Sequence, residues 1–324
     1  MSDKTIVMPS ESIYKMIENI KKQQDKVTQK SIKTEEIQPY LSPEGEQLPL
    51  FNPTLYDIAI KDYFHIMDVA VFRLSKRYHQ KKETIRYDLS DGYVEVSSGE
   101  TGMASIWDYD ILLMAISQVT ESYNLYKKGR GKMPGKTMRL ELKDIFKFCR
   151  RTPGGKQKDN LVSAVKRLNT THVHIERNIG GKILDVGENL ISRYAVISDD
   201  KGSVKGIEIE IPSLMYYKIV NTDTPAILTL HPDFHRINTA FGRFVYRLAR
   251  RVAGKKSATY LFSTLYERSG SKSPIREFRR MLRKLIKKNV LPEYDLKEME
   301  SKHGEPLLVM TFRDFLLEDT DKIE

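Results

Sequence analysis

The sequence has little of what secreted, membrane-spanning or cysteine-dependent proteins need. Its 324 residues contain one cysteine, Cys149, which allows neither an internal disulfide nor a cysteine-based metal cluster. The longest apolar run, residues 111–116, is too short to cross a bilayer, and residues 1–10 lack the basic and apolar stretches of a signal peptide. Because 40% of the residues are hydrophobic and 30% are charged, we expect a globular protein that acts in the cytoplasm without membrane contact.

The positive charge of the chain is confined to one window. The net charge is +11, yet residues 241–290 hold fifteen Lys and Arg against only two acids, Glu267 and Glu277. The remaining residues hold 39 basic and 41 acidic side chains. Crowded like charges oppose folding, whereas a bound polyanion neutralises them and releases its own counterions. Nucleic acid is therefore the expected partner, ahead of an anionic membrane surface.

Hydrophobic periodicity and turn residues predict the same order of elements in two halves of the chain. Each half has a strand, a short helix, a turn, a second helix and then two strands joined by a loop. In the first half these elements are residues 137–142, 143–150, 156–168, 171–177 and 183–188. In the second half they are residues 258–262, 263–268, 274–288, 294–299 and 307–312.

This order of elements is that of the winged helix-turn-helix. We predict an α+β protein with two tandem winged-helix domains, residues 51–222 and residues 223–324, after a flexible tail of residues 1–50 that has room for one short helix. Further strands are expected at residues 72–74, 84–96, 194–198 and 207–211, and further helices at residues 106–126 and 239–253.

The helix at residues 274–288 carries the strongest functional signal. At about 100° per residue, Phe278, Met281, Leu282 and Leu285 share one face, which predicts packing into a core. The other face is cationic, as expected of a helix in the major groove, where Arg reads guanine and Lys holds phosphates. The alternative is a solvated face, but solvated faces usually interleave acids with their cations. The predicted DNA-binding residues here are Lys272, Ser273, Arg276, Arg279, Arg280, Arg283, Lys284 and Lys287.

Two further helices supply cations for the same role. On the helix at residues 239–253, Phe244 and Leu248 are predicted to face inward and Arg243, Arg247 and Arg250 outward, where they would grip backbone phosphates. Pairing of some of these arginines with acids inside the domain is the open alternative. The first-half helix at residues 156–168 is expected either to make lighter DNA contacts or to serve self-association. Its cations are Lys156, Lys158, Lys166 and Arg167.

The tail contains one short peptide with a recognisable pattern, residues 47–51. Gln47 with Leu48, Leu50 and Phe51 is similar to the peptide by which bacterial polymerases and repair factors bind the sliding clamp. A glutamine amide suits a small polar pocket, and the two large apolar residues suit a hydrophobic one. The open alternative is that these apolar residues begin the core of the first domain.

Catalytic sites are not expected, although two patterns require a comment. His172 and His174 on one strand resemble the paired histidines of rolling-circle nickases, for which Tyr216 and Tyr217 would supply nucleophiles. A nickase needs a third metal ligand and a protected strand, so two histidines on one strand face are the simpler interpretation. The acids around Trp107, Asp108 and Asp110, are explained by the dipole at a helix start. We therefore expect no enzymatic activity, no metal and no cofactor.

The sequence resembles the plasmid replication initiator protein A family. The resemblance extends from about residue 50 to residue 300 and marks a family rather than a catalytic motif. The stretches that carry it are residues 72–77 (FRLSKR), 102–112 (GMASIWDYDIL), 244–250 (FVYRLAR), 265–271 (LYERSGS) and 291–294 (LPEY).

This resemblance implies a DNA-binding initiator similar to the iteron-type proteins, which bind repeated origin sequences and help to open an AT-rich duplex. It also implies double-stranded origin DNA, a second copy of the chain, the host replicative helicase and the host initiator as partners, with dimers limiting plasmid copy number. Within the family, residues 47–51 would contact the sliding clamp. A winged-helix transcriptional regulator is the alternative function, and a metal-dependent rolling-circle nickase is a weaker one.

Overall fold

A computed structural model of the chain describes residues 58–74, 82–179, 181–221 and 226–314. The predicted tail, the clamp-like peptide of residues 47–51 and the predicted domain boundary at residues 222–223 lie outside these ranges and stay predictions. The chain divides into two units. One comprises Pro53–Asn178 and Ile183–Glu324. The other comprises Met1–Asn52 and Ile179–Lys182.

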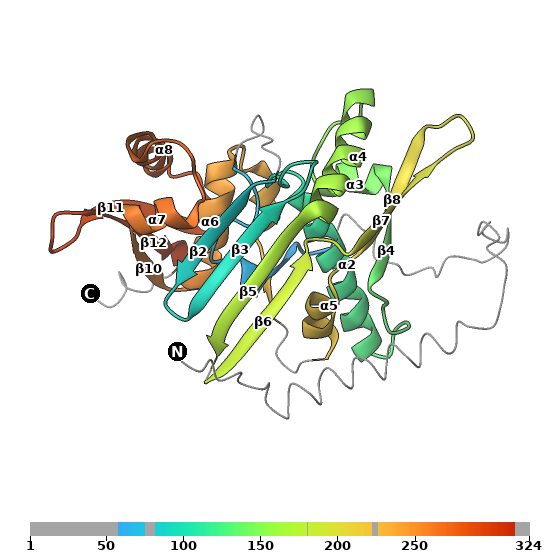
Figure 1. The fold of residues 1–324 in the computed structure, drawn as a ribbon, viewed down its shortest axis with the longest axis horizontal. Helices are drawn as coiled ribbons and strands as arrows, with labels where there is room; N and C mark the ends of the chain where they lie inside the picture. Colours follow the sequence, from blue (N-terminus) through green and yellow to red (C-terminus); the bar gives the residue numbers. More distant parts are fainter. Residues whose placement is uncertain (1–57, 75–81, 180, 222–225, 315–324) are drawn as a thin grey trace, which may run out of the picture. The chain divides into compact units, whose positions relative to one another are not determined.

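The first half contains a three-stranded antiparallel sheet with two helices inserted after its first strand. The strand β4 (Thr137–Glu141) leads directly into α3 (Leu142–Phe148), and α4 (Gly155–Thr170) follows after a turn. The sheet is completed by β7 (Arg193–Ser198) and β8 (Val204–Glu210), in the order β4-β8-β7 (Figure 1). Leu140, opposite Ile207, belongs to the core beneath the two helices.

The second half repeats this order of elements. Here β10 (Ser257–Leu261) leads into α7 (Phe262–Arg268), which is followed by α8 (Ile275–Lys288) and the hairpin of β11 (Tyr294–Glu300) and β12 (Pro306–Phe312). The sheet order is β10-β12-β11, which matches β4-β8-β7 strand for strand (Figure 1). The predicted positions of these elements are confirmed to within one or two residues.

One strand assignment in the first half was wrong. The two strands that were expected to close the first unit, β5 (Thr171–Ile179) and β6 (Lys182–Asn189), belong to a separate four-stranded sheet with β2 (Thr84–Leu89) and β3 (Gly92–Ser98). The order of that sheet is β2-β3-β5-β6 (Figure 1). The hairpin β7–β8 takes the place that they were assigned. Strand patterns along a sequence reveal a strand but not its partner, because pairing is set by the fold.

The longest helix, α2 (Tyr109–Lys127), has an almost wholly buried first half. It was predicted to begin at residue 106, but residues 105–108 form a reciprocal turn instead. In this turn the Ser105 amide donates to the Asp108 carboxylate at 2.7 Å and the Asp108 amide donates to the Ser105 hydroxyl at 3.3 Å. A shorter helix, α5 (Ser213–Val220), packs against α2.

The two halves share elements at their junction. The strand β1 (Lys61–Tyr63) of the first half pairs antiparallel with β9 (Ile227–Thr229) of the second. Short 3-10 turns follow each of them, η1 (Phe64–Ile66) and η2 (Pro232–Arg236), and then α6 (Ala240–Val252) begins at a Thr239 hydroxyl that accepts from the Gly242 amide. The predicted strand at residues 72–74 is only an isolated bridge between Arg73 and Ser105. Among the described helices, none has the length and apolar content to cross a membrane.

Candidate nucleic-acid interface

The helix α8 is held at both ends by local backbone features. Pro274 occupies the cap position before Ile275, and Ser273 lies one residue before it and is exposed. Asn289 ends the helix in the left-handed conformation, with φ 46° and ψ 44°, a geometry in which Asn is tolerated better than most residues. Its side chain donates to Asp295 at 2.5 Å and accepts from the Leu296 amide at 3.0 Å, which ties the helix end to β11.

One side of α8 is buried, as predicted, although Met281 on that side is only half-buried. Phe278, Leu282 and Leu285 lie in the core, and Phe278 contacts the rings of Phe241 and Tyr266 edge-on. The remaining surface is cationic and solvent-accessible. Its exposed members are Arg276, Arg280, Arg283, Lys284, Lys287 and Lys288, and Arg279 is half-buried. Over the described residues, Arg276, Lys284, Lys287 and Lys288 form no ion pair with a carboxylate.

Two of the predicted DNA-binding arginines have carboxylate partners. Arg280 pairs with Glu277 one turn earlier at 2.9 Å, and Arg283 makes a two-pronged contact with Glu298 of β11, with its closest approach also 2.9 Å. Both arginines remain more than half exposed, at 67% and 54%. Exposed pairs of this kind contribute about 1 kcal/mol or less, so a phosphate can replace the carboxylate at small cost.

Lys272, in the turn before α8, is exposed, but its ammonium group is held by a carboxylate. Its ammonium group pairs with the buried Glu83, whose carboxylate also accepts from Arg73 at 2.8 Å. Arg73 in turn donates to the carbonyl of Gly270 at 2.8 Å. The turn between α7 and α8 is thereby fixed to the first half of the chain.

The prediction that Arg243 and Arg247 face outward was wrong. Both side chains are buried, at 1% and 0% exposure. Arg243 binds both oxygens of Asp110 at 2.8 and 2.9 Å, and Arg247 binds Asp62 at 2.6 Å. The alternative, that these arginines pair with acids inside the fold, is therefore correct for both. Neither arginine is available to DNA.

The two buried pairs lie among aromatic rings and further polar groups. The Arg243 guanidinium lies 4.0 Å from the ring centre of Trp107, and Tyr109 donates to Asp62 at 2.8 Å. Burial opposes ionisation of Asp110, but Arg243 and then His235 outweigh it and hold the pKa of that carboxyl well below its usual range. Asp110 lies in the first turn of α2, as interpreted, and the structure also makes it the partner of Arg243.

Arg250, the third arginine of α6, is half-buried and donates to the carbonyl of Thr229 at 2.7 Å. Its neighbour Arg251, which the sequence did not single out, pairs with Asp68 at 3.5 Å and lies over the ring of Phe64. The helix α6 therefore holds the two halves together and contributes little to an exposed cationic surface.

The helix α4 is less cationic than predicted. Arg167 makes a two-pronged contact with Asp108, both distances being 2.8 Å, and is mostly buried. Lys158 is half-buried near the Ser203 hydroxyl, at 3.3 Å. Only Lys156 and Lys166 stand fully exposed. The acid Asp108, interpreted as a helix-start residue, thus neutralises one of the four cations assigned to this helix.

The histidines of β5 contact polar side chains of the neighbouring strand. His172 lies 3.1 Å from the Asn189 amide oxygen, and His174 lies 2.7 Å from an Asp185 carboxylate oxygen. The Tyr216 hydroxyl donates to the carbonyl of Pro134 at 2.5 Å. Within the described ranges, no three His, Cys, Asp or Glu side chains are placed to hold a metal ion together.

Sequence reasoning missed the acidic partners of the buried arginines. Asp62, Asp68 and Asp110 are all buried, and each pairs with an arginine that is distant along the chain. The sequence around Asp110 did indicate a buried acid, because acids interrupt an apolar stretch there. An acid in such a place is expensive to bury unless a cation joins it.

Comparisons with known proteins report on the family and the fold of the chain. A protein of Wigglesworthia glossinidia brevipalpis named as a replication protein is 28% identical over 218 residues, which cover 65% of this chain and 76% of that protein. The crystal structure of domains 2 and 3 of RctB, in selenomethionine form, shares the fold with a TM-score of 0.52 at 12% identity, over 76% of this chain and 97% of that one. The family described as replication initiator protein A matches residues 61–296. The chain belongs to the replication initiator protein A family.

Proposed function

We propose that the chain initiates plasmid replication by binding repeated origin sequences through the exposed face of α8. The observation that carries the proposal is the row of cations on a helix whose opposite side is buried in a core. Arg276, Lys284 and Lys287 are exposed and form no ion pair among the described residues. Family membership supports a replication initiator role, and phosphate neutralisation by such a row supplies affinity for DNA.

The proposal includes a fold assignment for the two repeated units. In each unit a strand, two helices and a hairpin follow one another, and the sheet order is the same. We assign both as winged helices, with α4 and α8 as the second helices of the two motifs and β7–β8 and β11–β12 as the wings. In this assignment α8 enters the major groove and the weakly cationic α4 makes the lighter contact, in the bacterial cytoplasm where plasmid DNA lies.

Further partners belong to the same proposal. We infer from the family that a second copy of the chain, the host replicative helicase and the host initiator join the origin complex, and that no catalytic group of this chain is needed. The sliding clamp is a partner if residues 47–51 bind it. Capture of purified clamp by the chain, and loss of capture in the Leu50→Ala, Phe51→Ala variant, tests that contact.

The test of DNA binding removes three cations from α8. We expect Arg276→Ala, Lys284→Ala, Lys287→Ala to weaken binding to a labelled fragment of the plasmid origin by at least about tenfold at moderate salt, and to lower the slope of log affinity against log salt by roughly three. The matched control is Lys128→Ala, Arg130→Ala, Lys132→Ala, which removes the same charge from exposed positions after α2. Equal loss in both variants would show that only net charge matters and would overturn the role of α8.

A second measurement separates the initiator from its alternatives. A plasmid that carries the origin but lacks the gene should replicate when the chain is supplied in trans, and should fail with the α8 variant. A transcriptional regulator would bind the DNA without supporting replication. A nickase would leave a covalent protein–DNA adduct with a labelled single strand and Mg²⁺, which we do not expect.

A further inference from the structure

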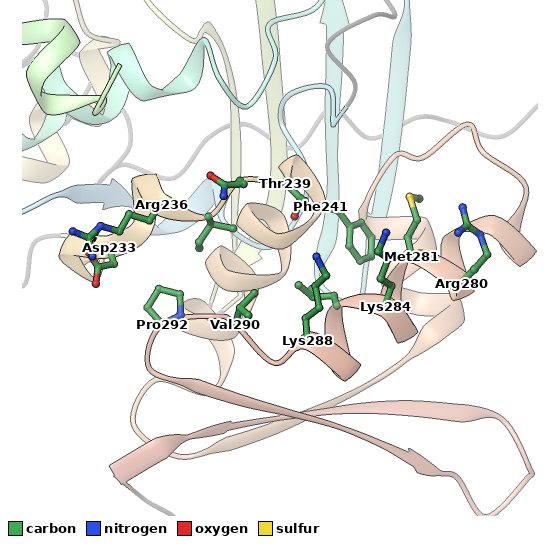
Figure 2. Close-up of a pocket in the computed structure, with 13 residues that line it drawn as sticks. Asp233, Arg236, Thr239, Phe241, Arg280, Met281, Lys284, Lys288, Val290 and Pro292 are labelled. Carbon is green, nitrogen blue, oxygen red and sulfur yellow. Dashed lines mark ion pairs between the residues drawn. The ribbon is translucent and has the colours of Figure 1, made fainter. Parts of the chain in front are cut away.

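A groove of about 780 Å³ lies beside α8, between that helix, the start of α6 and η2 (Figure 2). Its lining is apolar along the middle, where Phe241, Met281, Leu285 and Val290 contribute. Val290 is 64% exposed, so part of this apolar surface is open to solvent. An apolar groove with an exposed valine in its lining is suited to a peptide with apolar side chains.

Cations border the same groove. Figure 2 shows Lys284 and Lys288 extending from α8 beside Phe241, with Arg280 further along the helix. One carboxylate, Asp233, also lines it, but that group already contacts Arg236 at 3.1 Å and Arg150 at 3.3 Å. The groove therefore has an excess of positive charge, and a peptide that fits it needs acidic residues as well as apolar ones.

The described chain ends close to this groove. The Arg313 guanidinium donates to the carbonyls of Asn289 at 3.0 Å and Leu291 at 3.3 Å, and the Arg313 amide donates to the carbonyl of Glu293 at 2.8 Å. Val290 lies within this loop and lines the groove. Arg313 is thus held against the loop that carries Val290.

The residues that follow have the composition the groove calls for. Positions 315–317 are Phe-Leu-Leu, and positions 318–324 are Glu-Asp-Thr-Asp-Lys-Ile-Glu, with four acids and one lysine. Ten residues span up to about 33 Å when extended. The groove runs along α8 from residue 280 to the end of the helix at Lys288, a distance of about 12 Å, so the segment is long enough to reach Arg280, Lys284 and Lys288.

We propose that residues 315–324 bind in this groove of their own chain and compete with DNA for Arg280, Lys284 and Lys288. The apolar residues cover Val290 and Met281, and the acids meet the lysines of α8. The inference rests on the proposed DNA contact of α8, because competition requires that DNA use the same cations. Bound in this way, the segment restrains DNA binding until the origin displaces it.

The expected effect of the segment on DNA affinity follows from its covalent attachment to the chain that carries the groove. A segment joined directly to its site has an effective concentration on the order of 1 mM. If the free peptide bound with a dissociation constant of about 0.1 mM, the attached segment would occupy the groove roughly ten times out of eleven. Release of the segment would then tighten DNA binding by about tenfold.

The first arm of the test measures the groove without DNA. In the full chain, Leu316→Ser, Leu317→Ser releases the segment, and a fluorescein-labelled peptide of residues 315–324 is titrated with this variant. We expect binding that is about tenfold tighter than to the unaltered chain, in which the groove is occupied. Adding Val290→Asn, which keeps the charge, should weaken peptide binding by at least about tenfold. A peptide with Glu318→Lys and Asp319→Lys that bound equally well would overturn the proposal, as would equal binding to every variant.

The second arm measures origin DNA by the same titration. Leu316→Ser, Leu317→Ser should tighten DNA binding by about tenfold, Val290→Asn should do the same, and the combination should do no more than either. Peptide binding with unchanged DNA affinity would retain the groove but overturn the competition. If the α8 triple variant also left DNA affinity unchanged, the proposed function itself would fail, while the peptide arm would still report on the groove. Self-association that depends on the segment, measured by light scattering, would place it in a second copy and overturn the intramolecular contact.

Discussion

At the scale of single residues, the charge of an arginine does not reveal where it lies. Arg243 and Arg247 stand one turn apart on α6, beside Phe244 and Leu248, and the amphipathic pattern placed them at the surface. The structure places a second surface against that side of the helix, so both sides of α6 are covered. A helical period identifies one buried face but does not report whether another part of the chain covers the opposite one.

The buried pairs lead to a prediction for Asp110. We expect Asp110→Asn to lower the free energy of unfolding by about 3–5 kcal/mol, because it leaves the buried Arg243 without its counter-charge. The Asp110 pKa is depressed in the folded state, so the stability from this pair is fully present above about pH 4 and declines as the pH falls below the ordinary value of 3.8. Denaturant titration at pH 7 measures the change.

The control for this prediction is Asp144→Asn, a half-buried acid in the first turn of α3. It should change the free energy of unfolding by less than about 0.5 kcal/mol. Equal losses in both variants would contradict the importance of the buried pair.

At the scale of helices and strands, the sequence predicted the elements better than their pairing. The positions of α7, α8, β11 and β12 follow from apolar spacing and from the residues that end each element, all of which are local. The joining of β5 and β6 to β2 and β3 is not local, since the partner strands lie some eighty residues earlier. The cationic face of α8 was predictable for the same reason as the helix itself, whereas the carboxylate partners of Arg283 and Lys272 come from elements elsewhere in the fold.

The contact between α8 and its neighbouring strand gives a prediction about DNA. Glu298 of β11 holds Arg283 at 2.9 Å and, under the proposed function, would compete with a DNA phosphate for it. We expect Glu298→Gln to tighten origin binding by about threefold at low salt, and the gain to shrink at high salt. Fluorescence anisotropy with labelled origin DNA measures both affinities.

The matched control is Glu300→Gln, which removes the same charge from an exposed position on the same strand. A similar gain in DNA affinity in that variant would mean that the negative charge of the strand as a whole weakens DNA binding. The release of Arg283 would then not be the cause.

At the scale of the whole molecule, the two halves belong to one compact unit. The pairing of β1 with β9, the ion pair between Arg247 and Asp62, and the hydrogen bond from Arg73 to Gly270 all join the first half to the second. Two units related by the same order of elements can unfold separately when their interface is small and polar. Here the interface contains fully buried ion pairs, and the two members of each pair come from different halves of the chain.

We therefore expect the described fold to unfold in a single transition. Far-UV circular dichroism reports on both halves, and the fluorescence of Trp107, the only tryptophan in the sequence, reports on the first. The two signals should give the same midpoint in urea, and Arg247→Met should shift both midpoints by the same amount. Two separate transitions, or a shift of only one signal, would contradict the coupling.

The unequal charge of α4 and α8 gives the molecule a direction. A protein with two identical DNA-contacting units binds a palindrome equally well in either orientation. A chain that contacts DNA strongly through one unit and weakly through the other, as we propose, would bind the duplex in one orientation. Sites that face the same way along an origin would then line up all bound copies head to tail, so that every copy presents the same flank to whatever assembles next.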